Sequence, residues 1–250
     1  MKFFATALTC AALMTSGFAI SQASAESFDD AQKQEINTLI QNYIEENPKV
    51  ILDALENYRL EQIRQVEEEA GAKAAALIED VRENPNKFPT IGAKNGEVIV
   101  VEFFDYNCGY CKKAFETIQE ALDKNKDVTF ALIEMPILGP TSKIASQYSL
   151  AAEKQGKYLE FHTAVMNHKG QKDAAAMKEI GKKVGLDIAR LEKDAKSDAV
   201  QEAIDANMKI AEELGITGTP GIIIESEIIR GYIPYEQMNS VIQAEKKKKG

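Results

Sequence analysis

The stretch that decides the fold is EVIVVEFFDYNCGYC, residues 97–111. Its first eight residues are mostly apolar and β-branched, and this pattern is typical of a buried central strand. Asp105 to Cys108 then turn the chain, and apolar residues recur at helical spacing from Gly109 to Leu122. The stretch therefore predicts a buried strand that delivers two cysteines, Cys108 and Cys111, to the start of a helix.

The residues that follow predict an α/β fold. A second apolar run, Val128–Ile133, is of strand length, and a strand, a helix and a strand in this order form a right-handed parallel unit. From about residue 141 to 214 the pattern is helical, with breaks expected at Gly156, Gly170, Gly181 and Gly185. Short strands are predicted at 222–224 and 228–230, and a final helix near Pro234, because proline suits a first helical turn.

The segment before this fold, residues 26–84, predicts two helices that meet at Asn47-Pro48, since the residue before proline avoids the helical region. The second helix is long and mostly charged, with a narrow apolar stripe. The stripe comprises Leu52, Leu55, Ile63, Val66, Ala70, Ala74, Leu77 and Val81. Such a stripe cannot form a core alone, so it packs on its own domain or on copies of itself. We favour self-association, because the segment is long and the breaker-rich residues 84–89 separate it from the rest of the chain. We expect a trimer, with a dimer as the alternative.

The first 25 residues have the pattern of a secretory signal peptide. Lys2 precedes a short apolar run, which includes Cys10, and Ala23-Ser24-Ala25 is a small-x-small sequence that signal peptidase accepts. We therefore expect export to the periplasm. The expected organisation is a signal peptide at 1–25, a helical oligomerisation segment at 26–84 and a catalytic domain at 85–250.

The charge of the chain argues against one class of partner. The formal net charge is −9, whereas proteins that bind nucleic acid carry excess lysine and arginine. One basic run, Lys246–Lys249, lies near the C-terminus, where we expect a solvated tail.

Two cysteines remain after the signal, Cys108 and Cys111, and their spacing in an oxidising compartment favours a redox pair. Unpaired N–H groups and the dipole at a helix start favour a negative charge on the first thiol, and the thiolate is the attacking species. The second thiol lies about one turn further into the helix and is less exposed. We therefore expect Cys108 to attack and Cys111 to resolve, with a reversible Cys108–Cys111 disulfide.

Other uses of the two thiols are weaker hypotheses. A zinc site is disfavoured, because the spacing of His162 and His168 from the pair matches no common site, and we expect both to be ordinary helix or loop residues. A structural disulfide across so short a loop would constrain the unfolded chain little. Capture of Cu(I) by two soft thiolates stays as an alternative.

The sequence FFDYNCGYCK at 103–112, with Thr219-Pro220 far downstream, resembles the DsbA-like branch of the thioredoxin superfamily. The motifs FDDAQK at 28–33 and YIEENP at 43–48 are similar to the N-terminal segment of the ScsC type (suppressor of copper sensitivity). The resemblance covers essentially the whole mature chain. It implies a thioredoxin fold with an inserted helical domain at about 141–214, preceded by the helical oligomerisation segment.

The resemblance also implies roles for single residues. Thr219-Pro220 matches the cis-proline loop, which faces the redox pair and binds substrate backbone. Glu102 matches a buried acid beneath the resolving cysteine, where it could relay the proton that Cys111 loses. The alternative for Glu102 is a position at a strand edge facing solvent. No cofactor beyond the redox-active disulfide is implied.

The residues between the cysteines bear on the direction of the reaction. Gly109-Tyr110, which we expect to contact substrate, and Thr219 resemble oligomeric periplasmic isomerases more than monomeric oxidases. We therefore expect a disulfide isomerase or reductase that acts on exported client proteins with cysteines and exchanges electrons with a membrane redox partner. A dithiol oxidase is the first alternative, and a non-enzymatic periplasmic chaperone or copper-binding protein is the second.

Overall fold

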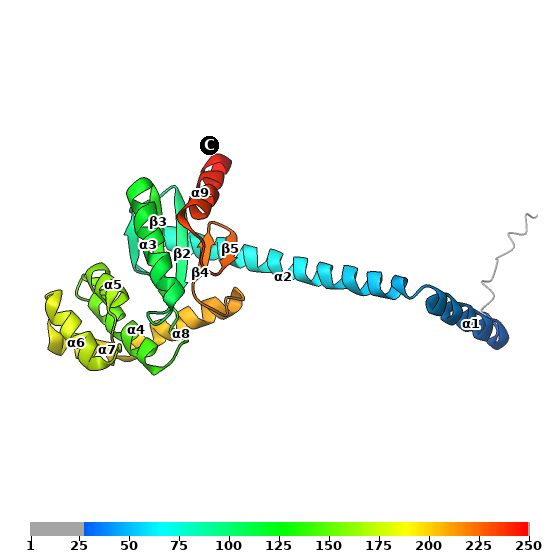
Figure 1. Ribbon diagram of the computed structural model, residues 1–250, viewed down its shortest axis with the longest axis horizontal. Coiled ribbons are helices and arrows are strands. Elements are labelled where there is room, and N and C mark those ends of the chain that lie inside the picture. The colour runs from blue at the N-terminus through cyan, green and yellow to red at the C-terminus, as the bar shows by residue number, and fades with distance from the viewer. Residues whose placement is uncertain (1–27, 250) are drawn as a thin grey trace, which may run out of the picture. The chain divides into compact units, whose positions relative to one another are not determined.

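The computed structural model describes residues 28–249 (Figure 1). The predicted signal peptide at 1–25, with Cys10, lies outside the described residues. The chain divides into two compact units between Tyr58 and Arg59, inside a long helix. Within residues 28–249, no helix combines the length and the apolar character that a membrane span requires.

The elements follow the order expected from the sequence, with one additional strand. The helices are α1 (Asp30–Glu46), α2 (Lys49–Glu83), α3 (Gly109–Lys124), α4 (Pro140–Glu153), α5 (Tyr158–Asn167), α6 (Ala174–Lys183), α7 (Ile188–Ala195), α8 (Asp198–Glu213) and α9 (Tyr235–Lys249). The strands are β1 (Thr90–Gly92), β2 (Val98–Phe104), β3 (Val128–Glu134), β4 (Gly221–Ile224) and β5 (Glu227–Arg230).

The N-terminal unit is helical and exposes its apolar side chains. Asp29 caps α1 through a reciprocal pair of hydrogen bonds with Gln32, and the helix ends at Asn47, before Pro48. No side chain of α1 is buried. The large exposed apolar side chains of this unit are Phe28, Ile36, Leu39, Ile40, Tyr43, Val50, Ile51, Leu52, Leu55 and Tyr58.

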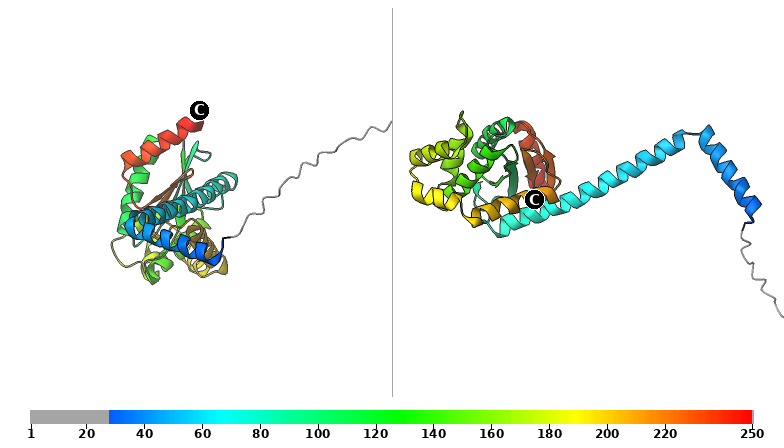
Figure 2. Two further views of the ribbon diagram at one scale, coloured as in Figure 1. Left: turned by 90° about the vertical axis from the view of Figure 1, so that its right-hand side faces the viewer. Right: turned by 90° about the horizontal axis from the view of Figure 1, so that it is seen from below.

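The second unit is built on a mixed sheet (Figure 2). Its five strands lie in the order β1-β3-β2-β4-β5. The central pair, β2 and β3, is parallel, and the other neighbours are antiparallel. Every residue of β2 and β3 is buried. One face of the sheet packs against α3 and α9, and the opposite face packs against α8 and the end of α2. The chain therefore has a thioredoxin-like fold, and α4 to α7 form the inserted helices beside it.

The apolar stripe of α2 is exposed in its first part and buried in its second. Leu60, Ile63 and Val66 are exposed, whereas five side chains nearer the end of the helix are buried against the sheet. The buried side chains are Ala70, Ala74, Leu77, Ile78 and Val81. This part of the stripe packs on its own domain and not on copies, so the compact unit begins well before the expected boundary at residues 84–85.

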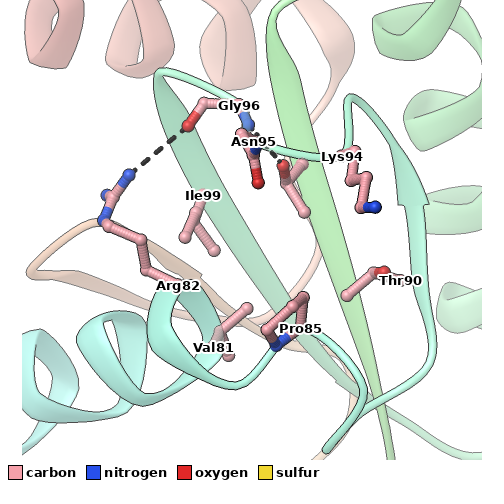
Figure 3. A pocket seen from close by; sticks show the side chains of 9 residues that line it. Val81, Arg82, Pro85, Thr90, Lys94, Asn95, Gly96 and Ile99 are labelled. Atoms are coloured by element: carbon pink, nitrogen blue, oxygen red, sulfur yellow. Dashed lines mark hydrogen bonds between the residues drawn. The ribbon is translucent and has the colours of Figure 1, made fainter.

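Polar contacts hold the same end of α2 in place. Arg82 donates to the carbonyl oxygen of Gly96 at 3.4 Å (Figure 3) and pairs with Glu225 at 3.4 Å. Glu67, less than one turn before the buried part, pairs with Arg230 of β5 at 3.2 Å. These contacts join α2 to the loop before β2, to the turn between β4 and β5, and to β5 itself.

Two expectations about the helices were wrong. Gly181 does not break a helix but lies inside α6, where it packs closely on α7: a Cβ there would sit 2.7 Å from Cδ2 of Leu191. The C-terminal lysines are not a solvated tail: they continue α9, Lys246 pairs with Asp127 at 2.7 Å, and Lys249 pairs with Glu225 at 2.9 Å.

Candidate active site

Cys108 is the N-cap residue of α3, directly after the turn that follows β2. Its N–H donates to the carbonyl oxygen of Asp105 at 3.0 Å, which closes the turn. Cys111 lies within the first turn of the helix, and both thiols are free. Cys108 is 8% exposed and Cys111 is fully buried, so the first thiol is the more accessible of the two.

The loop that contains Thr219 and Pro220 contacts Cys108. The Thr219–Pro220 peptide bond is cis, and the Cys108 thiol donates to the carbonyl oxygen of Thr219 at 3.3 Å. The carbonyl of Pro220 accepts from the N–H of Gly231 at 3.0 Å, which ties the loop to the end of β5. The fold thus joins two motifs that are 111 residues apart in the sequence.

Glu102 lies in the middle of β2 and is buried, with 1% of its surface exposed. The alternative of a solvent-facing Glu102 is therefore wrong. Neither carboxyl oxygen has a hydrogen-bond partner in the described structure. Burial, and secondarily the nearby charge of Cys108, raise the pKa of Glu102 to about 8. Burial, and secondarily the charge of Glu102, raise the pKa of the Cys111 thiol far above its ordinary value.

The residues between the cysteines lie at the open side of the site. Gly109 begins α3, and a Cβ added there would meet no neighbouring atom within 4 Å. Tyr110 is 60% exposed, and its ring stacks on Tyr232 with centroids 6.3 Å apart. Lys113 lies over the same ring at 5.3 Å. Gly109 and Tyr110 are therefore accessible beside the thiols.

Asp105 organises the turn before Cys108, and the sequence analysis gave it no role. One of its carboxylate oxygens accepts from the N–H of Asn107 and from the Ser142 hydroxyl, both at 2.7 Å. The other accepts from the N–H of Leu138 at 2.9 Å. A signal was present in the sequence, because Asp commonly bonds the backbone two residues ahead in a turn.

The profile of the family described as "DSBA-like thioredoxin domain" matches residues 99–243, more than half of the chain. The chain belongs to this family. Its members are thiol–disulfide oxidoreductases, and the site described above supplies the dithiol that such chemistry requires.

Solved structures similar to this DSBA-like protein include oxidoreductases of the expected type. A thioredoxin-like oxidoreductase from Silicibacter pomeroyi DSS-3 is 36% identical, with a TM-score of 0.64, over 67% of this chain and 97% of that one. A linker-deletion mutant of Proteus mirabilis ScsC is 26% identical, with a TM-score of 0.64, over 90% of this chain and 100% of that one. Over most of its length the chain is thus similar to ScsC, a DsbA-like protein.

This chain covers most of one curated relative and less than a third of another. Disulfide bond formation protein D of Bacillus subtilis is 25% identical over 181 residues, 64% of this chain and 78% of the relative. A Na(+)/H(+) antiporter, NhaA 3 of Salinispora tropica, is 22% identical over 188 residues. That match spans 74% of this chain and only 29% of the antiporter.

A buried polar cluster of the DSBA-like domain was missed by sequence reasoning. It contains Tyr106, Glu134 and His162, all fully buried. His162, which the sequence placed among ordinary helix residues, packs in α5 against the active-site turn, whereas His168 lies in the loop after α5 and contacts Gln171. Among residues 28–249, no three or more His, Cys, Asp or Glu side chains gather in a way that could hold a metal ion.

Proposed function

We propose that this protein is a disulfide isomerase and reductase of exported proteins, acting through the Cys108–Cys111 pair. The observation that carries the proposal is the position of the Cys108 thiol, which lies at a helix start, is more accessible than Cys111 and is 3.3 Å from the carbonyl oxygen of Thr219. A client strand that follows the cis-proline loop would bring its own sulfur to Cys108. Thr219 and Pro220 would then bind the client backbone.

The first step is attack of the Cys108 thiolate on a client disulfide. A bond forms between the Cys108 sulfur and one client sulfur, the client S–S bond breaks, and the second client sulfur leaves as a thiolate. The free N–H groups at the start of α3 stabilise the negative charge on Cys108 before attack. Cys108 is therefore the nucleophile, and a mixed disulfide is the intermediate.

The second step releases the client in one of two ways. In isomerisation, another client thiolate attacks the client sulfur of the mixed disulfide and restores the Cys108 thiolate. In reduction, Cys111 attacks the Cys108 sulfur, and the client leaves as a thiol. Cys111 is buried and must lose a proton for this attack, and Glu102 takes it, because a carboxyl with a pKa of about 8 exchanges protons near neutral pH.

The assignment to isomerisation rests on the N-terminal part of the chain. Large apolar side chains are exposed along α1 and α2 up to Val66, and monomeric proteins seldom expose so many together. Assembly through this face, as a trimer or alternatively a dimer, would present several dithiols to one client and raise their effective concentration. Gly109-Tyr110 and Thr219 favour the same assignment by their resemblance to oligomeric isomerases.

The cellular setting follows from the predicted signal peptide at residues 1–25. A relative from Salmonella enterica serovar Typhimurium, 28% identical with a TM-score of 0.61 over 68% of this chain and 97% of that one, is described as a periplasmic thioredoxin-like protein. We place this protein in the periplasm, with a membrane redox partner that holds the pair reduced. Its clients are exported proteins with cysteines.

Ribonuclease refolding tests the proposed activity. The reduced protein should reactivate scrambled ribonuclease and reduce insulin, and should oxidise reduced ribonuclease poorly. Rapid oxidation of reduced ribonuclease without reactivation of the scrambled form would instead assign a dithiol oxidase. Inactivity in all three assays, with client aggregation suppressed or Cu(I) bound, would assign a chaperone or copper-binding protein.

The assembly is tested by deleting residues 28–58, the described part of the N-terminal unit. Deletion as far as residue 84 would also remove Ala70 to Val81 from the core, so its effect could not be assigned to assembly. The shorter deletion should give a monomer by light scattering that loses at least about tenfold in isomerase activity and keeps dithiol oxidation.

Point substitutions provide the matched control. Leu52→Glu with Leu55→Glu introduces charge on the exposed face of α2 and should also reduce the assembly. Leu159→Glu introduces one negative charge at an exposed leucine of α5 and should not reduce the assembly, and either α2 substitution alone is its match in charge. A deletion variant with the same number of subunits as the parent would contradict the assembly.

A further inference from the structure

Tyr106 is fully buried in the loop just before Cys108, and its hydroxyl lies between two titratable side chains. The hydroxyl oxygen is 3.0 Å from Oε1 of Glu134 and 2.9 Å from Nδ1 of His162. Glu134 ends β3, and His162 belongs to α5 of the inserted helices. Tyr106 therefore joins the loop of the nucleophile to the sheet and to the insertion at one point.

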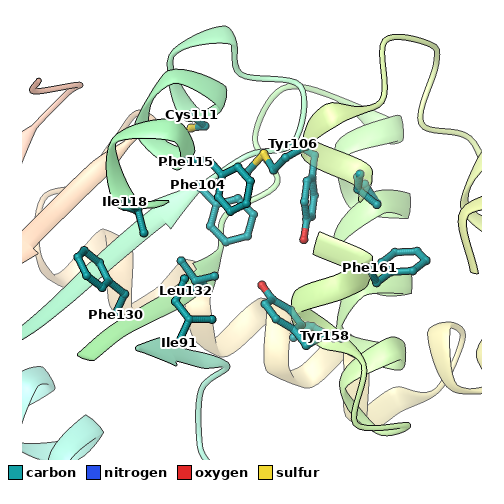
Figure 4. Close-up of a cluster of buried hydrophobic side chains, with 14 of the residues drawn as sticks. Ile91, Phe104, Tyr106, Cys111, Phe115, Ile118, Phe130, Leu132, Tyr158 and Phe161 are labelled. Atoms are coloured by element: carbon teal, nitrogen blue, oxygen red, sulfur yellow. The ribbon is translucent and has the colours of Figure 1, made fainter. Parts of the chain in front are cut away.

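Glu134 is surrounded by donors. The Tyr158 hydroxyl donates to Oε1 at 2.9 Å, and the Ser146 hydroxyl donates to Oε2 at 2.7 Å. In Figure 4 the hydroxyl ends of Tyr106 and Tyr158 point toward each other. Burial raises the pKa of Glu134 to about 8, although the hydrogen bonds from Ser146, Tyr158 and Tyr106 act to lower it. Glu134 thus changes its protonation close to neutral pH.

The ring of His162 is enclosed by aromatic side chains. Its centroid is 4.9 Å from that of Phe104, 5.0 Å from that of Phe115 and 5.5 Å from that of Tyr158. Burial lowers the pKa of His162 to about 3, so the ring is neutral at physiological pH and carries one proton, on Nδ1 or on Nε2. Nε2 has no hydrogen-bond partner among the described residues.

The hydrogens of this cluster can be arranged in two ways, because the Tyr106 hydroxyl has one hydrogen and two neighbours. When Glu134 is neutral, it donates to the Tyr106 oxygen, Tyr106 donates to Nδ1, and His162 carries its proton on Nε2. When Glu134 is ionised, Tyr106 donates to the carboxylate, and His162 carries its proton on Nδ1 and donates to Tyr106.

The two arrangements differ by one proton. On ionisation, the Glu134 proton passes to Tyr106, the Tyr106 proton passes to Nδ1 of His162, and the Nε2 proton is released to solvent. Three hydrogens become two, and the cluster gains one negative charge. Nε2 is buried and has no hydrogen-bond partner, so exchange of this proton with solvent requires local opening of the fold.

We propose that Glu134, Tyr106 and His162 form a proton relay that positions the loop before Cys108, and hence tunes the reactivity of this thiol. The turn from Asp105 to Cys108 is closed by one backbone hydrogen bond, and Tyr106 fixes it from the inside. Without this contact, Cys108 moves from the start of α3 and loses the stabilisation of its thiolate. The effect on Cys108 rests on the proposed function, whereas the relay itself does not.

Nitrogen NMR of ¹⁵N-histidine-labelled, reduced protein tests the relay. The chain has two histidines, so the signals of His162 and His168 are readily assigned. In the parent, His162 should change from the Nε2–H to the Nδ1–H tautomer between about pH 6 and about pH 9, either side of the pKa of Glu134. Tyr106→Phe and Glu134→Gln should each abolish this change.

Tyr148→Phe is the matched control, because it removes a buried hydroxyl without a hydrogen-bond partner and should leave the tautomer change intact. A single His162 tautomer throughout in the parent, or a tautomer change that persists in both test variants, would overturn the relay. If Tyr106→Phe does not fold, as judged by circular dichroism, Glu134→Gln alone decides.

Alkylation of the parent thiols by iodoacetamide tests the positioning of Cys108. Tyr106→Phe and Glu134→Gln should slow alkylation about fivefold at pH 6 and shift its pH profile to higher pH, whereas Tyr148→Phe should not. Coincident profiles of the parent and both test variants would overturn the positioning. If Cys108→Ser retained oxidoreductase activity, the proposed function would fail, and the NMR result would still decide the relay.

Discussion

Glu102 and Glu134 are two carboxyls on the same face of the sheet, one in β2 and one at the end of β3. Both are buried, and burial raises the pKa of each to about 8. They differ in their partners: Glu134 accepts hydrogen bonds from Tyr106, Tyr158 and Ser146, whereas Glu102 accepts none. Similar pKa values thus arise in opposite surroundings.

The difference separates two uses of a buried acid. A buried polar group without partners costs about 1–3 kcal/mol, so its persistence points to a function at that position. Glu102 lies where its charge contributes to the raised pKa of Cys111, and we propose that its free oxygens exchange a proton with this thiol. The oxygens of Glu134 are occupied, and its proton can move only along the hydrogen bonds that hold it.

The largest expected effect is on catalysis. Glu102→Gln keeps the shape of the side chain but cannot accept the Cys111 proton, so insulin reduction at pH 7 should slow about a hundredfold. Glu134→Gln should slow it far less, because that carboxyl acts only through the position of Cys108. Equal rates for the two variants would remove the distinction between the carboxyls.

The next effect is on stability at pH 5, where both carboxyls are protonated in the folded protein. Glu134→Gln replaces an accepting oxygen with an NH2 group and leaves a buried hydroxyl unpaired, so the free energy of unfolding should fall by about 2 kcal/mol. Glu102→Gln leaves no donor unpaired and should change it by less than about 1 kcal/mol. Urea unfolding measures both, and a reversed order would contradict the assigned contacts.

The smallest expected effect is on the slope of the free energy of unfolding against pH. Each carboxyl holds its proton in the folded protein to about pH 8 and loses it in the unfolded chain near the ordinary value of 4.5. The unfolded state therefore binds fewer protons in this window, and stability falls as pH rises, by up to about 1.4 kcal/mol per pH unit for each carboxyl. Either Gln variant should remove the contribution of one carboxyl to this slope, as measured by urea unfolding at several pH values. An unchanged slope would show that the substituted carboxyl ionises normally.

Local patterns were sufficient to predict the elements around the thiols. The β-branched run of β2 and the helical spacing of α3 are properties of adjacent residues, so the sequence alone places Cys108 at a helix start. The strand β1 was missed, because it has three residues, follows a stretch rich in breakers and forms only by pairing with β3. Its existence depends on tertiary contacts that no local pattern records.

The division of α2 was also hidden, because the apolar spacing is the same in both parts of the helix. A signal was present in side-chain size: the exposed part carries Leu52, Leu55 and Ile63, whereas the buried part opens with Ala70 and Ala74, which allow close approach to the sheet.

Glu134 and His162 were missed for another reason. A single polar residue in an apolar run predicts a solvent-facing side chain, and only the strand register and the packing of α5 bury them.

The proposed chemistry depends above all on Cys108 attacking and Cys111 resolving. Its most direct test is mass spectrometry of the Cys111→Ser variant after incubation with scrambled ribonuclease. We expect a trapped mixed disulfide in which the client is bound to Cys108, and no such adduct in the Cys108→Ser variant. Equal adducts in the two variants, or a client bound to Cys111 in the Cys108→Ser variant, would contradict it.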